Sequence, residues 1–132
     1  MTTAVKMSCA MISDVEWRTD ARAFARAHAR GPPIARVWVQ GECVDDDGVE
    51  ARVRDGTGTV RVVRRVRERA LRFGAYVVVR GALANEGGER AIRDADVVPI
   101  EDEGVARSRA DAWVAEVDEL WNVVYAAGLG CE

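Results

Sequence analysis

Apolar and polar residues alternate along the middle of the chain, in short segments separated by glycine, aspartate and asparagine. Side chains two residues apart lie on the same face of a strand, so this alternation predicts strands that are buried on one face. Several short strands between turns are typical of an antiparallel sheet. The pattern predicts five strands, over residues 35–44, 49–54, 59–63, 75–83 and 89–98.

The first and fourth predicted strands carry the clearest signals. The buried face of the first is expected to hold Val37, Val39, Gly41 and Cys43. Trp38 lies among polar residues on its other face. The fourth strand contains three consecutive valines, at 77–79, and is therefore expected to be the most buried. Gly41 and Gly81 interrupt these two strands at points where a barrel wall bends sharply or a bulge forms.

The connections between the strands indicate a particular barrel. Glycine-containing turns at 45–48 and 55–58 join the first three strands. An arginine-rich connection at 64–73 leads to the fourth strand and is long enough for about two helical turns. Five strands, a connection between the third and fourth, and a trailing helix are the pattern of an OB-fold. The predicted fold class is all-β with flanking helices: a five-stranded Greek-key OB-fold barrel followed by a C-terminal helix.

The tail, residues 107–127, changes to helical spacing. Ser108 and Asp111 form a capping-box pattern at its start. Apolar side chains then recur at intervals of three and four residues, and their stripe consists of Trp113, Val117, Leu120, Trp121 and Val124. Two tryptophans are typical anchors of protein interfaces, so we expect a second polypeptide to cover this stripe. The alternative is that the helix folds back onto its own barrel.

The N-terminal segment ends at a clear boundary, because Gly31 is followed by two prolines that disfavour regular structure. The mixture of alanine and arginine at 20–30 predicts a short helix, capped by Thr19 and ended by Gly31. The expected organisation is an N-terminal arm with this helix, a barrel, and a linker with an amphipathic helix, over residues 1–33, 34–100 and 101–132. Together they form one domain, as a chain of 132 residues allows.

Composition and charge restrict the class of protein. Apolar residues at 48% and charged residues at 31% allow a buried core with a polar surface. The net charge of −3 lacks the basic surplus of most nucleic-acid-binding proteins. Six arginines between 61 and 72 form a local basic cluster, which is either a solvated surface or a phosphate-binding stripe. The chain is expected to be intracellular and not to enter membranes. Its three cysteines are scattered, and the sequence contains neither a signal-like apolar segment nor a run of about 20 apolar residues.

Residues with catalytic or metal-binding chemistry are few. His28 is the only histidine, and no two cysteines have the spacing of a zinc site. The Asp45-x-Asp47 turn has Val49 and Gly56 where a calcium loop requires oxygen ligands. The glycine-rich turn at 55–58 lacks the lysine of a phosphate-binding loop. We therefore expect no catalytic residue, no metal and no cofactor, and an enzyme is the least favoured class.

Four segments of the chain resemble one protein family. They are VWVQG at 37–41, EARVRD at 50–55 with Gly58, YVVVRG at 76–81 and AWVAEVDEL at 112–120. They are similar to the RecQ-mediated genome instability protein 2 family, the small OB-fold subunit of the RecQ-mediated genome instability complex. The resemblance covers about residues 34–121, and the tryptophan in the first strand with the acidic, tryptophan-containing tail makes it more specific than a general OB-fold likeness.

The resemblance implies a nuclear, non-catalytic subunit that pairs with the C-terminal OB domain of the larger RecQ-mediated genome instability protein. Through that protein it would join a type IA topoisomerase III and a Bloom-type RecQ helicase in dissolving double Holliday junctions and maintaining genome stability. The tail helices of the paired OB domains would bundle as in the core of replication protein A. The family also implies that the pair can receive a peptide of a Fanconi-anaemia-type helicase, and that this barrel need not bind DNA directly.

Two further residues are candidates for partner contacts. Trp38 is one, unless the N-terminal arm covers it. Arg93, on the fifth strand, is expected to line a peptide groove together with Trp113. The main alternative is a single-stranded DNA-binding OB domain of the replication protein A type, in which Trp38 and Tyr76 would stack on bases and the arginines of 61–72 would contact phosphates.

Overall fold

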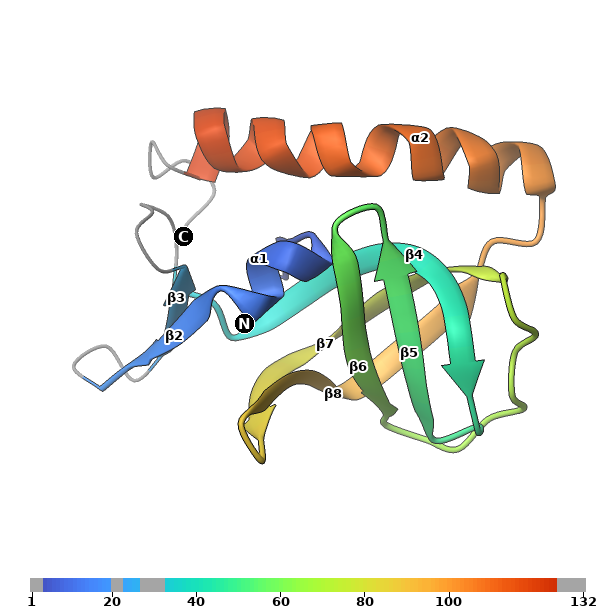
Figure 1. Ribbon diagram of the computed structural model, residues 1–132, viewed down its shortest axis with the longest axis horizontal. Coiled ribbons are helices and arrows are strands. Elements are labelled where there is room, and N and C mark those ends of the chain that lie inside the picture. The colour runs from blue at the N-terminus through green and yellow to red at the C-terminus, as the bar shows by residue number, and fades with distance from the viewer. Residues whose placement is uncertain (1–3, 20–22, 27–32, 126–132) are drawn as a thin grey trace.

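Five long strands close into a barrel beneath a C-terminal helix (Figure 1). The computed structural model describes residues 4–19, 23–26 and 33–125. The elements are β1 (Val5–Lys6), α1 (Cys9–Ser13), β2 (Val15–Arg18), β3 (Ala23–Arg26), β4 (Arg36–Asp46), β5 (Glu50–Asp55), β6 (Gly58–Arg64), β7 (Tyr76–Glu86), β8 (Glu89–Pro99), α2 (Glu103–Glu119) and the π-helical turn η1 (Leu120–Tyr125).

The order of the barrel strands is that of an OB-fold. The sheet runs β4-β5-β6-β8-β7, and β7 pairs back with β4 to close it. All of these pairs are antiparallel except β6 with β8, which is parallel. The five strands lie where the alternation predicts them, with ends that differ by a few residues. The predicted fold class is confirmed.

The core follows from the same alternation. Val37, Val39 and Cys43 of β4 point inward and are almost fully buried. In β7, Val77 and Val79 are buried but Val78 is only half-buried, so the three valines do not make this strand inaccessible on both faces. A closed barrel has one inner and one outer face, and the alternation persists even inside an apolar run.

Gly41 and Gly81 stand where backbones approach each other too closely for a side chain. A Cβ on Gly41 would lie 2.4 Å from the carbonyl oxygen of Arg54, and one on Gly81 would lie 2.6 Å from that of Arg93. The register between β7 and β8 also shifts around Gly81, as a bulge does. The prediction of a bend or bulge therefore holds for Gly81, and at Gly41 the requirement is close approach.

The arginine-rich connection between β6 and β7 is not helical, which corrects the prediction for residues 64–73. The guanidinium of Arg64 donates two hydrogen bonds to Asp46, at 2.5 and 2.8 Å, and both side chains are almost fully buried. Asp46 also accepts from the backbone N–H groups of Leu71 and Gly48, each at 2.8 Å. These long-range bonds hold the connection extended across the β4–β5 turn, in place of the i to i−4 bonds of a helix.

Asp46 remains ionised in this buried place. Burial would raise the pKa of its carboxyl group, but the hydrogen bonds from Arg64 and from the N–H groups of Leu71 and Gly48 together hold the pKa below its ordinary value. The carboxylate is therefore the fixed point to which the β6–β7 connection is tied.

The N-terminal segment is part of the barrel's core and not a separate arm. β1 pairs in parallel with β4, and Met7 and Ile12 are fully buried in the common apolar cluster. The predicted helix at 20–30 is wrong over Ala23–Arg26, which is strand β3 paired with β2. Phe24 is buried there and packs edge-on against Trp17, with ring centroids 5.1 Å apart, and this cross-strand contact outweighs the helix propensity of alanine and arginine. The rest of that stretch, with His28 and Gly31, lies outside the described residues.

Helix α2 begins four residues before the predicted start. Asp102 is its N-cap, and its carboxylate accepts a hydrogen bond from the N–H of Val105 at 3.0 Å. Ser108 and Asp111 lie inside the helix, so the predicted capping box is wrong. In the part of the chain that the structure describes, no helix is long and apolar enough to span a membrane.

Candidate partner interface

The apolar stripe of the tail faces the barrel of its own chain. Trp113, Val117 and Trp121 are at most 2% exposed and belong to the common core cluster. For these three residues the expectation of a covering partner is wrong, and the fold-back alternative holds. The physical reason is the N-terminal segment, which places Met7 and Ile12 in the same cluster and so extends the apolar surface available to the helix.

Lys6 of β1 ties this helix to the barrel. Its carbonyl oxygen accepts a hydrogen bond from Nε1 of Trp121 at 2.8 Å, and its Nζ lies 3.0 Å from the carboxylate of Glu116. Its backbone N–H donates to the hydroxyl of Tyr125 at 3.4 Å. One residue at the start of the described chain therefore contacts three positions on α2 and η1 and fixes the helix on the barrel. We call Lys6 together with the buried Trp113, Val117 and Trp121 the seat of α2.

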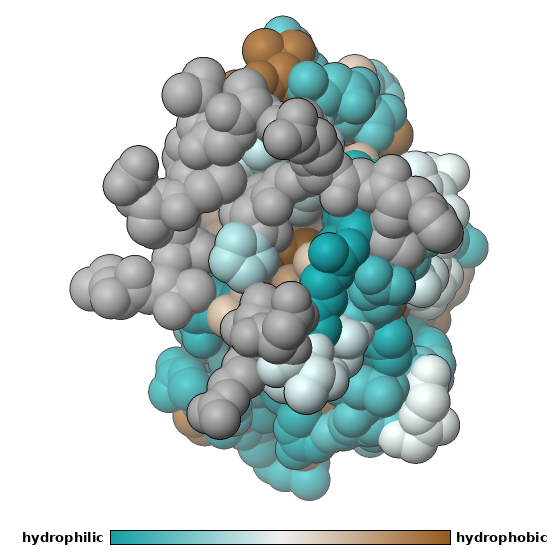
Figure 2. All heavy atoms as spheres, turned by 90° about the vertical axis from the view of Figure 1, so that its left-hand side faces the viewer, coloured by the Kyte–Doolittle hydropathy of each residue, from teal (hydrophilic) through white to brown (hydrophobic). Residues whose placement is uncertain are grey.

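The other two stripe residues are not enclosed. Leu120 and Val124 are half-buried, and their neighbour Val123 is 59% exposed. Viewed from the side that contains the end of α2, the described surface is mostly hydrophilic, with an apolar patch at its upper edge (Figure 2). We name Leu120, Val123 and Val124 the helix-end patch.

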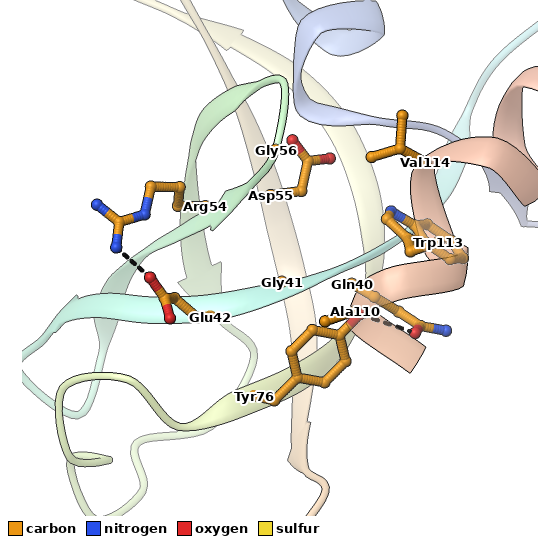
Figure 3. A pocket seen from close by; sticks show the side chains of 10 residues that line it. All are labelled: Gln40, Gly41, Glu42, Arg54, Asp55, Gly56, Tyr76, Ala110, Trp113 and Val114. Atoms are coloured by element: carbon orange, nitrogen blue, oxygen red, sulfur yellow. Dashed lines mark hydrogen bonds and ion pairs between the residues drawn. The ribbon is translucent and has the colours of Figure 1, made fainter. Parts of the chain in front are cut away.

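A small cleft of about 300 Å³ lies between α2 and the wall formed by β4 and β5 (Figure 3). Its lining consists of Gln40, Gly41, Glu42, Arg54, Asp55, Gly56, Tyr76, Ala110, Trp113 and Val114. Tyr76 is buried and donates to Oε1 of Gln40 at 3.2 Å, and burial raises its pKa to about 12. Tyr76 therefore offers no exposed ring for stacking.

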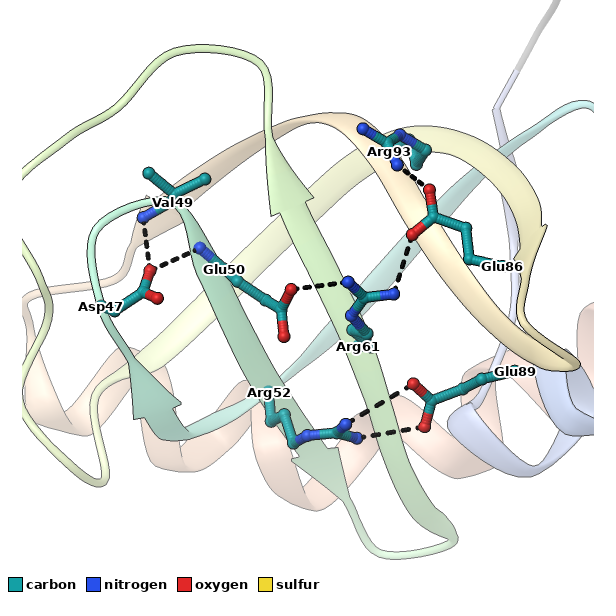
Figure 4. A network of polar contacts seen from close by, with 8 residues as sticks. All are labelled: Asp47, Val49, Glu50, Arg52, Arg61, Glu86, Glu89 and Arg93. Carbon is teal, nitrogen blue, oxygen red and sulfur yellow. Dashed lines mark hydrogen bonds and ion pairs between the residues drawn. The ribbon is translucent and has the colours of Figure 1, made fainter.

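Arg93 does not line this cleft. It lies on β8 and forms an ion pair with Glu86 of β7 (Figure 4). The structure does not bring Arg93 and Trp113 into one groove, so the predicted pairing of these two residues is wrong.

Trp38 stands half-buried on the outer face of β4 between two cations. Its register partners on the neighbouring strands are Lys6 of β1 and Arg80 of β7, which lie on opposite edges of β4. Each cation is 4.5 Å from the centre of the indole ring. The alternative that the N-terminal segment covers Trp38 therefore holds in part, through Lys6. Because both cations stack on the indole from opposite sides, a nucleic-acid base has no free ring face to stack on.

The outer face of β5 and β6 carries an ion-pair network (Figure 4). OB-folds commonly bind oligonucleotides on the face of their second and third strands, which here are β5 and β6. Arg61 contacts the carboxylates of Glu50 and Glu86, at 2.7 and 2.8 Å. Arg52 pairs with Glu89 at 3.4 Å, and Arg54 pairs with Glu42.

Each arginine on this face therefore has a carboxylate partner from the same chain. The hydrogen bond from Arg61 also lowers the pKa of Glu50, so the carboxylate stays charged. A phosphate would have to displace these partners, so the face is poorly suited to nucleic acid.

The cysteines of the described chain are enclosed. Burial raises the pKa of Cys9 to about 12 and also raises that of Cys43. A thiol held in its neutral form is a poor nucleophile and a poor metal ligand. Within residues 4–19, 23–26 and 33–125, no three histidine, cysteine, aspartate or glutamate side chains are grouped so that they could hold a metal ion.

Comparisons with known proteins agree with this architecture. The model of the family described as RecQ-mediated genome instability protein 2 matches residues 3–121. A search of curated protein sequences found no significant match. Among solved structures, a replication protein A heterotrimer bound to ssDNA contains a similar chain, with a TM-score of 0.64, 20% identity and coverage of 88% of this chain and 98% of that one. The Stn1–Ten1 complex of S. pombe contains another, with a TM-score of 0.73, 16% identity and coverage of 92% and 96%. At these identities the two structures show a shared OB-fold.

Proposed function

Because the chain belongs to the RecQ-mediated genome instability protein 2 family, we propose that it pairs, as a non-catalytic subunit, with the C-terminal OB domain of the larger RecQ-mediated genome instability protein. In this role it works in the nucleus and scaffolds a Bloom-type RecQ helicase and a type IA topoisomerase III in double Holliday junction dissolution. The family match carries the proposal, because residues 3–121 include the whole barrel and α2.

Two further observations support a subunit role. Both structural neighbours come from assemblies of several proteins, a heterotrimer and a two-protein complex. The charges of the β5–β6 face neutralise one another, and Trp38 is sandwiched between cations, so the barrel's outer surface favours protein contacts over base stacking.

The helix-end patch is the place proposed for pairing. Trp113, Val117 and Trp121 point into the barrel, so a partner helix has to meet another side of α2 and η1. Val123 is the most exposed apolar side chain there, and Leu120 and Val124 border it. Covering three branched aliphatic side chains gives the apolar centre that such an interface requires.

The test is co-expression of the full chain with the larger protein's C-terminal OB domain, followed by calorimetric titration. Val123→Asp together with Leu120→Asp is expected to weaken pairing about 30-fold or more, the effect of losing interface anchors. Val105→Asp, at the opposite end of α2 and 48% exposed, is the matched control and is expected to pair normally. Absence of any complex with the unaltered chain would refute the subunit role. Normal pairing by the folded double variant would refute the patch.

A further inference from the structure

The outer face of β4, β7 and β8 contains a groove that the described residues leave open. Its volume is about 800 Å³, in the range of pockets that enclose a ligand. The sheet forms its floor, and Ile100 and Arg109, which lead into and lie on α2, form one side. The groove is separate from the helix-end patch, and it adjoins the cleft beside Trp113, with which it shares Gln40.

Two rows of side chains cross the floor of this groove. The strand register places Trp38, Arg80 and Asp96 side by side in one row. The next row contains Gln40, Val78 and Val98. Val98 is 58% exposed and is the one large apolar side chain so exposed on the five barrel strands. The groove therefore offers an unfilled aliphatic strip beside a charged one.

The charged row is not neutralised as the β5–β6 face is. Asp96 is paired with Arg65 at 2.9 Å. Arg80 and Arg109 are both exposed, and among the described residues neither has a carboxylate within ion-pair distance. Among the described residues that line the groove, Glu68 is the only other acidic one. Next to the apolar strip, the described part of the groove therefore has two unpaired guanidinium groups, of Arg80 and Arg109, and one unpaired carboxylate, that of Glu68.

From this arrangement we propose that the groove binds an extended segment of a partner protein in which an acidic and an aliphatic side chain lie two residues apart and so point to the same face. The two rows are about 6.6 Å apart, the rise of two strand residues, which is also the spacing of alternate side chains in an extended peptide. A carboxylate would meet the guanidinium of Arg80 or Arg109, and an aliphatic side chain would cover Val78 and Val98. The inference rests on the proposed function in one respect, that the partners of this chain are proteins.

Single-stranded nucleic acid is the other polymer that could meet two arginines beside an indole. The environment of Trp38 disfavours it, because Lys6 and Arg80 already cover the ring from both sides. The valines of the second row offer a base no stacking partner, whereas an aliphatic side chain removes them from water.

The experiment is an NMR titration of the isotopically labelled full chain. The probes are a capped tetrapeptide with aspartate first and leucine third and with serine at the other two positions, its counterpart with lysine for aspartate, and a short oligothymidylate. The acidic peptide is expected to shift the amide signals of Val78, Arg80 and Val98 saturably, and to bind at least about tenfold more tightly than the lysine peptide. Arg109→Glu and Val98→Asp are each expected to weaken it about tenfold or more, and Arg107→Glu, a neighbouring exposed arginine outside the groove, is expected to bind normally.

Three results would overturn the inference: no saturable shift at millimolar peptide, shifts confined to β5 and β6, or stronger binding of oligothymidylate at the same signals. Circular dichroism checks the fold of each variant, and Arg109→Glu, on the surface of α2, decides the outcome if Val98→Asp unfolds. Pairing with the larger OB domain is measured on the same samples. Peptide binding in a chain that fails to pair would refute the proposed function while supporting the groove.

Discussion

The seat of α2 and the groove around Trp38 both contain tryptophan, yet the molecule uses the residue differently in the two places. Under α2, Trp113 and Trp121 are at most 2% exposed, and Nε1 of Trp121 is bonded to the backbone of β1. Trp38 is half-buried, with cations on both sides of its ring. The first region holds the fold together, and the second shapes a surface. An aromatic stripe in a sequence therefore identifies an apolar face but not the polypeptide that covers it.

The difference between the two regions comes from the N-terminal segment. β1 adds to β4 beside Trp38, and it supplies both the carbonyl oxygen that receives Trp121 and the ammonium group that stacks on Trp38. One short strand thus takes part both in holding the helix and in shaping the surface around Trp38. Variants that separate these two effects test whether the two regions differ in this way.

Substitutions beneath α2 should destabilise the chain most. Trp121→Ala removes a buried indole and its hydrogen bond, and we expect the free energy of unfolding to fall by about 3–5 kcal/mol. Urea unfolding followed by circular dichroism measures it. Val123→Ala, two residues away and exposed, is the control and is expected to change stability by less than about 0.5 kcal/mol. A Trp121→Ala chain of normal stability that no longer pairs with its partner would make this tryptophan an interface residue and remove the contrast.

The next effect concerns the buried ion pair that holds the β6–β7 connection, which contributes Glu68 to the groove. Arg64→Met leaves the buried carboxylate of Asp46 without its partner, and we expect a loss of about 3 kcal/mol in the free energy of unfolding at neutral pH. Arg65→Met breaks the exposed pair with Asp96, where both side chains are more than half exposed, and is expected to cost at most about 1 kcal/mol. Equal losses for the two variants would mean that the buried pair does not hold the β6–β7 connection.

The dependence of this loss on pH follows from the pKa of Asp46. In the unaltered chain that pKa is lower folded than unfolded, so its stabilising contribution is present above the ordinary carboxyl value of 3.8 and is lost as the pH falls below it. Without Arg64 the carboxylate gains a proton more readily. Unfolding measured at pH 7 and near pH 3 should therefore show the gap between Arg64→Met and the unaltered chain narrowing in acid.

Local patterns predict the barrel well because its alternation is imposed residue by residue. A strand with one inner and one outer face has to repeat with a period of two, and the barrel strands follow this period except at irregularities such as the adjacent buried residues Ala91 and Ile92 of β8. The β6–β7 connection could not be predicted in this way. Its conformation depends on Asp46, which lies 18 residues before Arg64, and local helix propensity contains no information about that bond.

The candidate surfaces show the same division. The alternation places Trp38 and Arg80 on outer faces, but only the register shows that they are neighbours and that Lys6 flanks the ring from the other side. Helical spacing groups Trp113 with Trp121 correctly, yet the surface that buries them is built partly from residues more than 100 positions earlier. Trp38 as a partner contact stays a prediction.

The smallest effect concerns the β5–β6 face, where carboxylates neutralise the arginines. Glu86→Gln with Glu89→Gln removes the carboxylates that pair with Arg52, Arg61 and Arg93. These pairs are partly exposed, so stability should change by less than about 1 kcal/mol. Arg61 keeps its pair with Glu50, while the freed guanidinium groups of Arg52 and Arg93 become available to phosphates. Fluorescence anisotropy with labelled oligothymidylate is expected to show affinity rising several-fold, with a steeper dependence on salt.

Glu101→Gln with Glu103→Gln, exposed residues at the start of α2, makes the same change of net charge and controls for it. If the unaltered chain already binds the oligonucleotide with the affinity and salt dependence of the Glu86/Glu89 variant, the ion pairs do not mask this face, and a single-stranded DNA-binding barrel becomes the better account of it.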